Sequence, residues 1–261
     1  RKDTTDKLTL ITPAIIMKKE NLNVSWFSTG VSSAVATKLV ITELDQILYT
    51  HIDDQHSDTL RFIKDCEMWF GKEIQILTSQ KAKSVEEACL SAGGKGYING
   101  PTGASCTRTL KRQVRQHWEN EIGNDYKLTY FWGMDYSEQK RADRVCESLP
   151  EYKHRFPLIE HKIGKTEAHE ILNASSIKRP AMYDLGYHNN NCVGCVKGGA
   201  GYWNKIRIDF PEVFMKRAEL ERKIGASCIK GIYLDELSPS KGRHQSPIVD
   251  ECGLLCSVQA I

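Results

Sequence analysis

The residues best suited to chemistry lie in a short loop of small and hydroxyl side chains. The loop reads Ser28-Thr29-Gly30-Val31-Ser32-Ser33 and joins an apolar segment, residues 22–27, to another, residues 34–40. We expect the first segment to be a buried strand and the second a helix. Backbone N–H groups at such a junction, with the positive end of the helix dipole, favour an anion. The loop therefore predicts a phosphate site in which Gly30 allows close backbone approach. An ordinary strand–turn–helix corner is the alternative.

A second candidate site is the cysteine pair of Cys192-Val193-Gly194-Cys195. Two thiolates separated by two small residues can hold one zinc or iron ion, because the tight turn aims both sulfurs inward. One pair is half of a metal site, so other cysteines must complete it. Cys106 stands at a predicted helix N-terminus, where the dipole favours a thiolate, and Cys252 and Cys256 form a looser pair. Structural zinc, an iron–sulfur cluster and free or redox thiols are the alternatives.

The remaining cysteines and the early sequence suggest the cellular setting. Cys66, Cys89 and Cys146 fall at apolar-looking helical positions and are expected to be small core residues, whereas Cys228 is left unassigned. Nine cysteines without a secretory signal favour the reducing cytoplasm. The early apolar run, residues 8–16, is short and interrupted by proline, so it predicts no membrane span.

Cationic side chains form two candidate binding surfaces. The first recurs at helical spacing after Cys106 and could hold sulfate, pyrophosphate or a nucleic-acid backbone; it comprises Arg108, Lys111, Arg112 and Arg115. The second interleaves cations with aromatic rings of the kind that stack on bases; it comprises Lys197, Tyr202, Trp203, Lys205 and Arg207. Solvated helix faces and a packed aromatic pair are the alternatives. The net charge of +3 permits a nucleic-acid partner without demanding one.

Two further groups suit a nucleotide pocket. Glu138 and Arg141 lie one helical turn apart, which suits an ion pair beside such a pocket or an ordinary surface pair. Tyr183, His188 and residues 189–191 are candidates for the mouth of the site.

The elements that must position these residues alternate between strands and helices. Strands are expected at residues 22–27, 46–52, 73–77, 128–132 and 156–159. Helices are expected at residues 34–40, 58–70, 84–92, 106–122, 165–172 and 212–224, with another that Ser137 would cap. This order predicts an α/β fold whose mostly parallel twisted sheet has helices on both faces and ligands at the carboxyl ends of the strands. We expect a tail at residues 1–20, a nucleotide-binding domain at 21–175 and a cysteine-rich extension at 176–261 packed on that same domain.

Together these motifs resemble the phosphoadenosine phosphosulfate reductase-like branch of the N-type (PP-loop) ATP pyrophosphatases. The motifs are the phosphate loop, the run from Cys106 to Lys111, Gly133 with Glu138 and Arg141, and the late Cys-x-x-Cys. The similarity covers roughly residues 22–225 and extends to the C-type subunits of DNA phosphorothioation systems and to phage-encoded relatives. It implies an adenine nucleotide alpha hydrolase-like fold. The family loop usually reads Ser-Gly-Gly-x-Asp-Ser, whereas this chain has Thr29 at the second position and Ser32 in place of the aspartate.

The resemblance also implies roles for particular residues. Nucleotide contacts would come from Ser28, Thr29, Gly30, Ser32, Ser33, Asp53, Gly133, Glu138 and Arg141. Candidate catalytic residues are Cys106, Lys111 and Cys252. Metal ligands would come from Cys106, Cys192, Cys195, Cys252 and Cys256. Iron–sulfur relatives carry a Cys-Cys pair where this chain has Cys106-Thr107, so three thiolates would leave one iron open, unless Cys252 or Cys256 closes it.

The resemblance favours an ATP pyrophosphatase that adenylates a substrate for sulfur insertion, with DNA or RNA as the acceptor. ATP or adenylyl sulfate, Mg²⁺ and an iron–sulfur cluster, with zinc as the alternative, would be its cofactors, and a cysteine desulfurase its sulfur donor. The alternative is an adenylyl sulfate reductase with a thioredoxin-like partner, because Glu251-Cys252-Gly253-Leu254 resembles the mobile tail of such enzymes, with Leu255 in place of a histidine. A third possibility is a non-catalytic nucleotide-binding subunit of a larger complex.

Overall fold

The computed structural model describes residues 20–123 and 125–242 and is built around a five-stranded sheet whose neighbouring strands all run parallel. The strands are β1 (Glu20–Phe27), β2 (Gln46–Thr50), β3 (Gln75–Leu77), β4 (Tyr126–Phe131) and β5 (Lys153–Arg155). Their order in space is β3-β2-β1-β4-β5. The chain thus leaves the central strand β1 on one side and later returns to β4 on the other. The general rule for such sheets predicts a ligand crevice at the carboxyl ends of β1 and β4.

The helical elements connect and surround these strands. The longer helices are α1 (Val31–Leu39), α2 (Asp58–Phe70), α5 (Gln113–Ile122), α6 (Gln139–Ser148), α8 (Lys165–Ala174), α10 (Ala200–Asp209) and α11 (Pro211–Ile224). The shorter ones are α3 (Val85–Leu90), α4 (Ser105–Thr107), α7 (Pro157–Glu160) and α9 (Ala181–Asp184), the π-helical turn η1 (Arg108–Arg112) and the 3₁₀ turns η2 (Tyr136–Glu138) and η3 (Leu234–Glu236). None of the helices in the described part of the chain combines the length and apolar character needed to span a bilayer.

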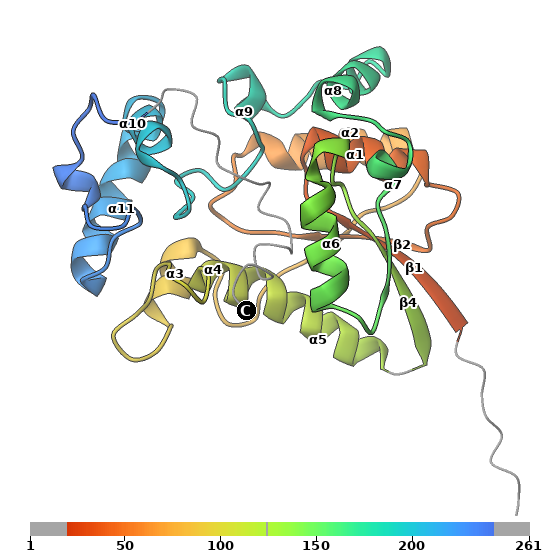
Figure 1. Ribbon diagram of the computed structural model, residues 1–261, viewed down its shortest axis with the longest axis horizontal. Helices are drawn as coiled ribbons and strands as arrows, with labels where there is room; N and C mark the ends of the chain where they lie inside the picture. Colours follow the sequence, from red (N-terminus) through yellow and green to blue (C-terminus); the bar gives the residue numbers. More distant parts are fainter. Residues whose placement is uncertain (1–19, 124, 243–261) are drawn as a thin grey trace, which may run out of the picture.

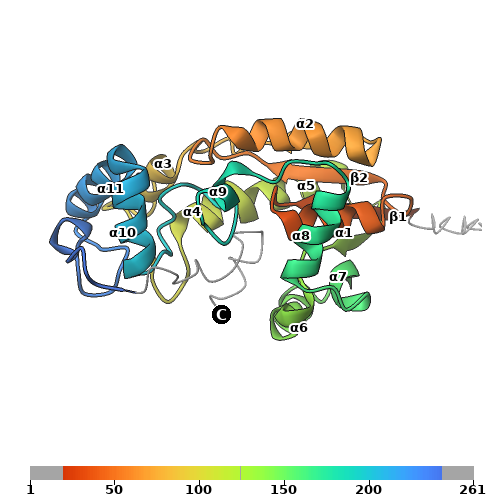
Figure 2. The ribbon, with the colours of Figure 1, turned by 90° about the horizontal axis from the view of Figure 1, so that it is seen from above.

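Two apolar clusters hold helices on the two faces of the sheet. Helices α1, α2, α7 and α8 share one cluster, which includes Phe27 and Phe62. Helices α5 and α6 share the other, in which Trp26 of β1 packs edge-on against Trp118 of α5. Alternate residues of a strand point to opposite faces, so β1 contributes to both clusters. Figures 1 and 2 show this layered arrangement, and the predicted α/β fold is confirmed.

A third apolar cluster lies beside the sheet and carries most of the later sequence. It joins α3 and α4 to α10 and α11, with Trp203 and Phe214 among its buried rings. We call this part the helical lobe; α10 and α11 lie at the left end in Figures 1 and 2. The cluster combines residues from before and after position 175. The predicted division into domains at that point stays a prediction.

Three local predictions are wrong for identifiable reasons. Residues 156–159 were expected to form a strand, but Pro157 begins α7, because proline suits the first turn of a helix and lacks a donor for a sheet. The helical turn after Gly133 is capped by Asp135, which accepts from the N–H of Ser137, and not by Ser137 itself. Cys146 is exposed, whereas the buried residues of α6 are Arg141, Ala142 and Val145.

Candidate functional site

The predicted phosphate loop lies at the carboxyl end of β1 and leads directly into α1. Its residues 29–33 are buried. The N–H of Ser28 donates to the hydroxyl of Ser33 at 3.0 Å, which closes the loop on itself. Gly30 precedes α1 in an extended conformation and has no side chain to cap the helix, while the N–H of Val31 donates to the hydroxyl of Tyr183 at 3.2 Å. Backbone N–H groups at a helix N-terminus can bind an anion where no side chain takes them.

The unusual residue of this loop is Thr29. Its φ of +61° lies in the left-handed region, which β-branched residues rarely adopt. The hydroxyl of Thr29 donates to the carbonyl of Ser28 at 2.6 Å. Sequence reasoning assigned the special backbone position to Gly30, but the structure places the left-handed residue one position earlier. Strain of this kind concentrates at binding and catalytic sites.

Gly133 lies against this loop, as its predicted place in the site requires. It follows β4, and a Cβ atom added there would lie 2.4 Å from Cα of Ser33. The end of β4 can therefore approach the start of α1 only because residue 133 has no side chain. This contact brings the carboxyl ends of β1 and β4 together at the expected crevice.

Two aspartates follow β2 and have different surroundings. Asp53 is exposed and lines a cavity of about 470 Å³ together with His56 and Arg217. The carboxylate of Asp54 accepts from the N–H of Val85 at 2.6 Å and from Arg217 at 2.9 Å. Asp53 is thus placed where a ligand could reach it, whereas Asp54 joins β2 to α3 and α11. In the sequence, the signal for a ligand-facing carboxylate here was the pair of aspartates directly after a buried strand.

Glu138 and Arg141 form the ion pair that their spacing predicts. Arg141 is buried and donates to one carboxylate oxygen of Glu138, while the other oxygen accepts from the N–H of Asp135 at 3.1 Å. Glu138 therefore serves the capping box of the η2 turn as well as the ion pair.

The Cys-x-x-Cys segment is a tight buried turn. Cys192 and Cys195 are both buried, and Gly194 between them has φ of +73°. A Cβ atom on Gly194 would lie 2.5 Å from a methyl group of Val213, so the turn requires glycine for its conformation and for its space. The hydroxyl of Tyr202 accepts from the N–H of Cys195 at 2.9 Å and donates to the carbonyl of Cys192 at 3.4 Å.

Hydrogen bonds join this turn to the edge of the sheet that carries the phosphate loop. The N–H of Val193 donates to the carbonyl of Asp54 at 2.8 Å. The side-chain amide of Asn190 donates to the carbonyl of Thr29 at 3.0 Å, and the hydroxyl of Tyr183 accepts from the N–H of Val31 at 3.2 Å. The cysteine turn and loop 28–33 are thus held in the same region of the molecule.

Cys106 and Lys111 lie where the first turn of a long helix is irregular. Cys106 is partly buried against the apolar cluster that contains Cys192 and Cys195. The π-helical turn η1, which includes Lys111, follows it. Such turns inside α-helices are frequent at functional sites.

The cysteines do not form a metal site within the part of the chain that is described. No three histidine, cysteine or acidic side chains of residues 20–123 and 125–242 are arranged to hold a metal ion. Cys252 and Cys256 lie outside these residues, so their predicted roles are not addressed. Cys106, Cys192 and Cys195 share an apolar cluster, but by themselves they do not fit the three-thiolate cluster site predicted from the sequence.

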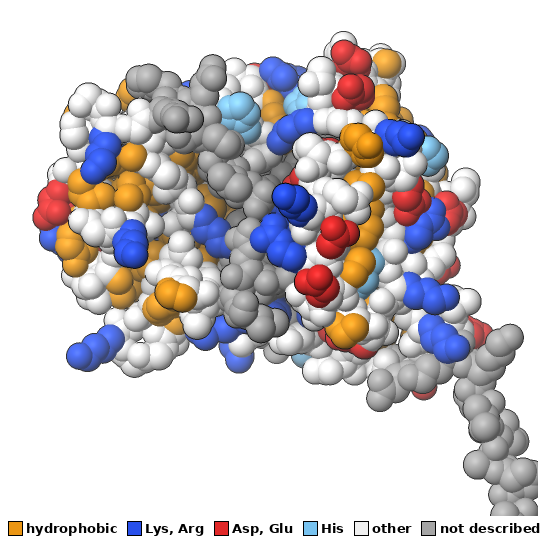
Figure 3. Space-filling view, in the orientation of Figure 1, with side chains coloured by type: hydrophobic (Ala, Val, Ile, Leu, Met, Phe, Trp, Pro, Cys, Tyr) orange, Lys and Arg blue, Asp and Glu red, His pale blue; other side chains and the backbone are white. Residues whose placement is uncertain are grey.

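Both predicted cationic surfaces need correction. Arg115 is buried against Glu119, because the π-helical turn interrupts the 3.6-residue spacing on which the stripe was based. Tyr202 and Trp203 are buried in the helical lobe and pack edge-on, so the predicted base-stacking surface is a packed aromatic pair. In the view of Figure 3, cationic and acidic side chains are interspersed over the half of the molecule that carries the sheet.

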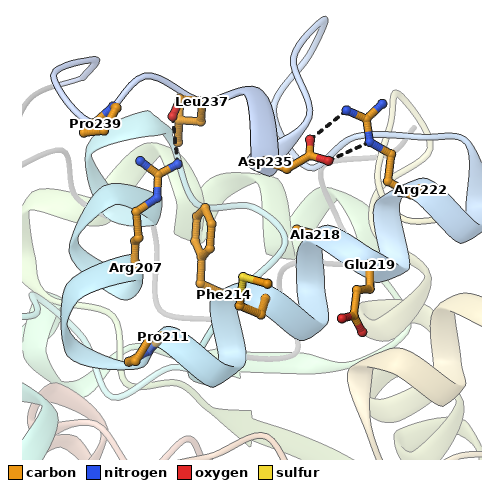
Figure 4. A pocket seen from close by; sticks show the side chains of 10 residues that line it. Arg207, Pro211, Phe214, Ala218, Glu219, Arg222, Asp235, Leu237 and Pro239 are labelled. Carbon is orange, nitrogen blue, oxygen red and sulfur yellow. Dashed lines mark hydrogen bonds and ion pairs between the residues drawn. The ribbon is translucent and has the colours of Figure 1, made fainter.

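A separate apolar cavity of about 730 Å³ lies in the helical lobe. Figure 4 shows Phe214 at its centre, the Arg222–Asp235 ion pair at one end and Arg207 at the other, where its guanidinium donates to the carbonyl of Leu237. Its lining contains no cysteine and no part of the phosphate loop, so we do not place the candidate site there.

Comparisons with known proteins add little to this geometry. No protein-family model matches the chain, and no curated protein matches its sequence. A crystal structure of phosphoadenylyl-sulfate (PAPS) reductase from Candida auris, in a phosphate complex, is similar with a TM-score of 0.47 and 13% identity. The similarity covers 68% of this chain and 83% of that chain, and at this level it does not establish a family. The class that the fold itself defines is an α/β protein with a parallel five-stranded sheet.

Proposed function

We propose that this chain binds ATP at loop 28–33 and splits it between the α and β phosphates to activate an acceptor for sulfur insertion. One observation carries the proposal: the phosphate-type loop and the Cys192–Cys195 turn meet at the same edge of the sheet. The Asn190–Thr29 and Val193–Asp54 hydrogen bonds make this connection. A nucleotide on the loop would therefore lie near the segment that carries the cysteine turn.

The proposed reaction has two displacements. An acceptor oxygen attacks the α-phosphorus, the bridging α–β P–O bond breaks, and pyrophosphate leaves. The N–H groups at the start of α1 can stabilise the negative charge that develops on the leaving pyrophosphate. A cysteine desulfurase would supply the sulfur as a persulfide, from which a dithiol reductant releases hydrosulfide while the dithiol is oxidised to a disulfide. The hydrosulfide then attacks the activated centre. The bond from that centre to oxygen breaks, and AMP departs with the oxygen and its electron pair. Mg²⁺ would accompany the triphosphate.

The acceptor that we propose is nucleic acid, either the DNA backbone or RNA. After the corrections above, this part of the proposal rests on the cations Arg108, Lys111 and Arg112 beside Cys106. No step is assigned to an iron–sulfur cluster or to zinc, because the described residues alone do not supply a complete ligand set. Ligation that includes Cys252 or Cys256 stays a prediction.

Reduction of an adenylyl sulfate is the second candidate function, favoured by the sequence around Cys252. In that reaction the Cys252 thiolate attacks the sulfate sulfur and displaces the nucleotide phosphate. A thioredoxin-like dithiol then reduces the enzyme–sulfite thiosulfonate and releases sulfite. Binding of nucleotide without turnover would instead indicate the non-catalytic subunit of a larger complex.

The proposal is tested on anaerobically purified full-length chain. ATP affinity is measured by calorimetry. Pyrophosphate release is measured separately with DNA and RNA acceptors. Sulfite release from adenylyl sulfate is measured in the presence of thioredoxin, for wild type and for a Cys252→Ser variant. Ser33→Ala removes the acceptor for the Ser28 N–H and should weaken ATP binding about tenfold. Ser79→Ala is the matched control, because its hydroxyl accepts from the N–H of Lys81 in an exposed loop. Absence of ATP binding, or equal loss in both variants, would contradict the proposal.

A further inference from the structure

The strained Thr29 is held by a side chain from a distant part of the chain. Asn190 Nδ2 lies 3.0 Å from the carbonyl oxygen of Thr29 and 3.3 Å from its hydroxyl oxygen. The same nitrogen lies 3.3 Å from the hydroxyl of Thr59 in α2. Because the Thr29 hydroxyl gives its proton to the carbonyl of Ser28, its lone pairs are available to the Asn190 amide. Both the backbone and the side chain of Thr29 are therefore bound by one residue.

The orientation of the Asn190 amide follows from these contacts. A carbonyl oxygen such as that of Thr29 only accepts, so the nitrogen of Asn190 must face it. Asn190 is 4% exposed, and its Oδ1 atom is buried without a hydrogen-bond partner among the residues that the structure describes. An unpaired buried oxygen opposes folding. The side chain is thus placed to serve Thr29 and not to satisfy its own hydrogen-bonding groups.

We propose that Asn190 is a positioning residue that keeps Thr29 left-handed and so keeps the N–H groups of loop 28–33 directed at the nucleotide phosphates. This inference rests on the proposed function and names the residue that shapes its binding loop. Asn190 also lies two positions before Cys192 in the sequence. The phosphate loop therefore takes its shape from the segment that carries the cysteine turn.

The test uses the ability of glycine to adopt positive φ without strain. In the full-length protein, Asn190→Ala should weaken ATP binding about tenfold, because Thr29 then relaxes toward ordinary backbone angles. Thr29→Gly alone should change the affinity less than threefold. In the Thr29→Gly, Asn190→Ala double variant the affinity should return to within threefold of wild type, because the loop no longer needs Asn190. A purely structural role of Asn190 would not predict this rescue.

Asn204→Ala is the matched control. Asn204 is also 4% exposed and donates to two backbone carbonyls, those of Ser238 and Lys241. Its buried Oδ1 atom has no hydrogen-bond partner within residues 20–123 and 125–242. Its loss should lower the urea midpoint of unfolding as the loss of Asn190 does, yet leave ATP affinity unchanged. Thr29→Gly should give no rescue in the Asn204→Ala background.

The possible outcomes separate this inference from the proposed function. Wild-type protein that does not bind ATP would overturn the proposed function and the positioning role with it. Wild-type binding that is unchanged in Asn190→Ala, or a tenfold loss that persists in the double variant, would overturn the positioning role alone. If Asn190→Ala does not fold, the comparison of the double variant with Thr29→Gly decides, since equal affinities are expected.

Discussion

The phosphate loop and the cysteine turn reach a similar backbone shape by different means. Each has a left-handed residue, Thr29 with φ of +61° and Gly194 with φ of +73°. In the cysteine turn that residue is glycine, and Tyr202, seven positions after Cys195, bonds the turn from within the same segment. In the phosphate loop it is a β-branched residue, bonded by Asn190 from 161 positions away.

This difference shows that one turn is specified locally and the other by the completed fold. Glycine at position 194 allows a positive φ without strain, and Tyr202 bonds the turn from nearby in the sequence. On the proposed role of Asn190, Thr29 is held left-handed once the segment that contains Asn190 has packed against the loop. We therefore expect substitutions within the cysteine turn to lower the stability of the fold. Substitutions far from loop 28–33 in the sequence should change the conformation of that loop.

The largest effect is expected for Gly194→Ala. A left-handed alanine costs about 1–2 kcal/mol, and its Cβ would lie 2.5 Å from Val213, which adds about 1–3 kcal/mol of overpacking. We expect a loss of about 2–5 kcal/mol in the free energy of unfolding, measured by urea titration.

Gly225→Ala separates the two contributions to that loss. Gly225 has a similar φ of +75°, but nothing lies within 4 Å of an added Cβ. This variant should lose only about 1–2 kcal/mol, the cost of the backbone angle. Equal losses in the two variants would show that Val213 moves aside, and that the space around Gly194 does not constrain the turn.

Tyr202→Phe should have the next largest effect. It leaves the buried N–H of Cys195 without its acceptor, which costs about 1–3 kcal/mol of unfolding free energy. We also expect faster reaction of Cys192 and Cys195 with a thiol reagent, because the turn opens more often. Tyr97→Phe, which loses a 3.2 Å contact with Thr102 in an exposed loop, should change stability by less than about 0.5 kcal/mol. A Tyr202→Phe variant as stable as wild type would show that the turn does not depend on this hydroxyl.

Much of the fold followed from local signals in the sequence. The helix at Asp58–Phe70, ended by Gly71 with φ of +65°, was predicted with its boundaries because apolar spacing and a terminal glycine coincide there. The strand predicted over residues 156–159 was wrong, because a short apolar run does not separate a strand from a helical turn, and Pro157 favoured the turn. Helix α10 was not predicted, because Tyr202 and Trp203 were assigned to a surface and not to its buried side.

The candidate site was predictable only where one short segment carries the signal. Loop 28–33 was singled out because small residues follow a strand, and Gly133 because of the family resemblance; the structure brings the two into contact. Asn190 and Tyr183 were named as candidates for the mouth of the site, but their bonds to Thr29 and Val31 could not be found from spacing, because each joins residues more than 150 positions apart. The basic stripe failed at Arg115 because helical periodicity does not reveal a π-helical turn.

The smallest predicted effect is a pH dependence of stability that involves the surroundings of the phosphate loop. Burial, with Arg179 and Lys165 nearby, lowers the pKa of His169 from 6.5 to about 4. At pH values between these two pKa values, the unfolded chain binds a proton at His169 that the folded chain does not. The contribution of neutral His169 to the free energy of unfolding is therefore fully present above about pH 6.5 and decreases toward pH 4. Because the ring is only half-buried, we expect a loss of about 1 kcal/mol in urea titrations.

His169→Gln should remove that part of the pH dependence while leaving the rest of the acid profile in place. The His169 ring packs edge-on against Tyr183 at 4.8 Å, and Tyr183 accepts from the N–H of Val31. Protonation of His169 should therefore increase hydrogen exchange in residues 28–33 before it does so in residues 192–195. If residues 28–33 still exchange before residues 192–195 in His169→Gln, the acid sensitivity belongs to another group. If both segments exchange together in wild type, the two turns do not differ in the way proposed.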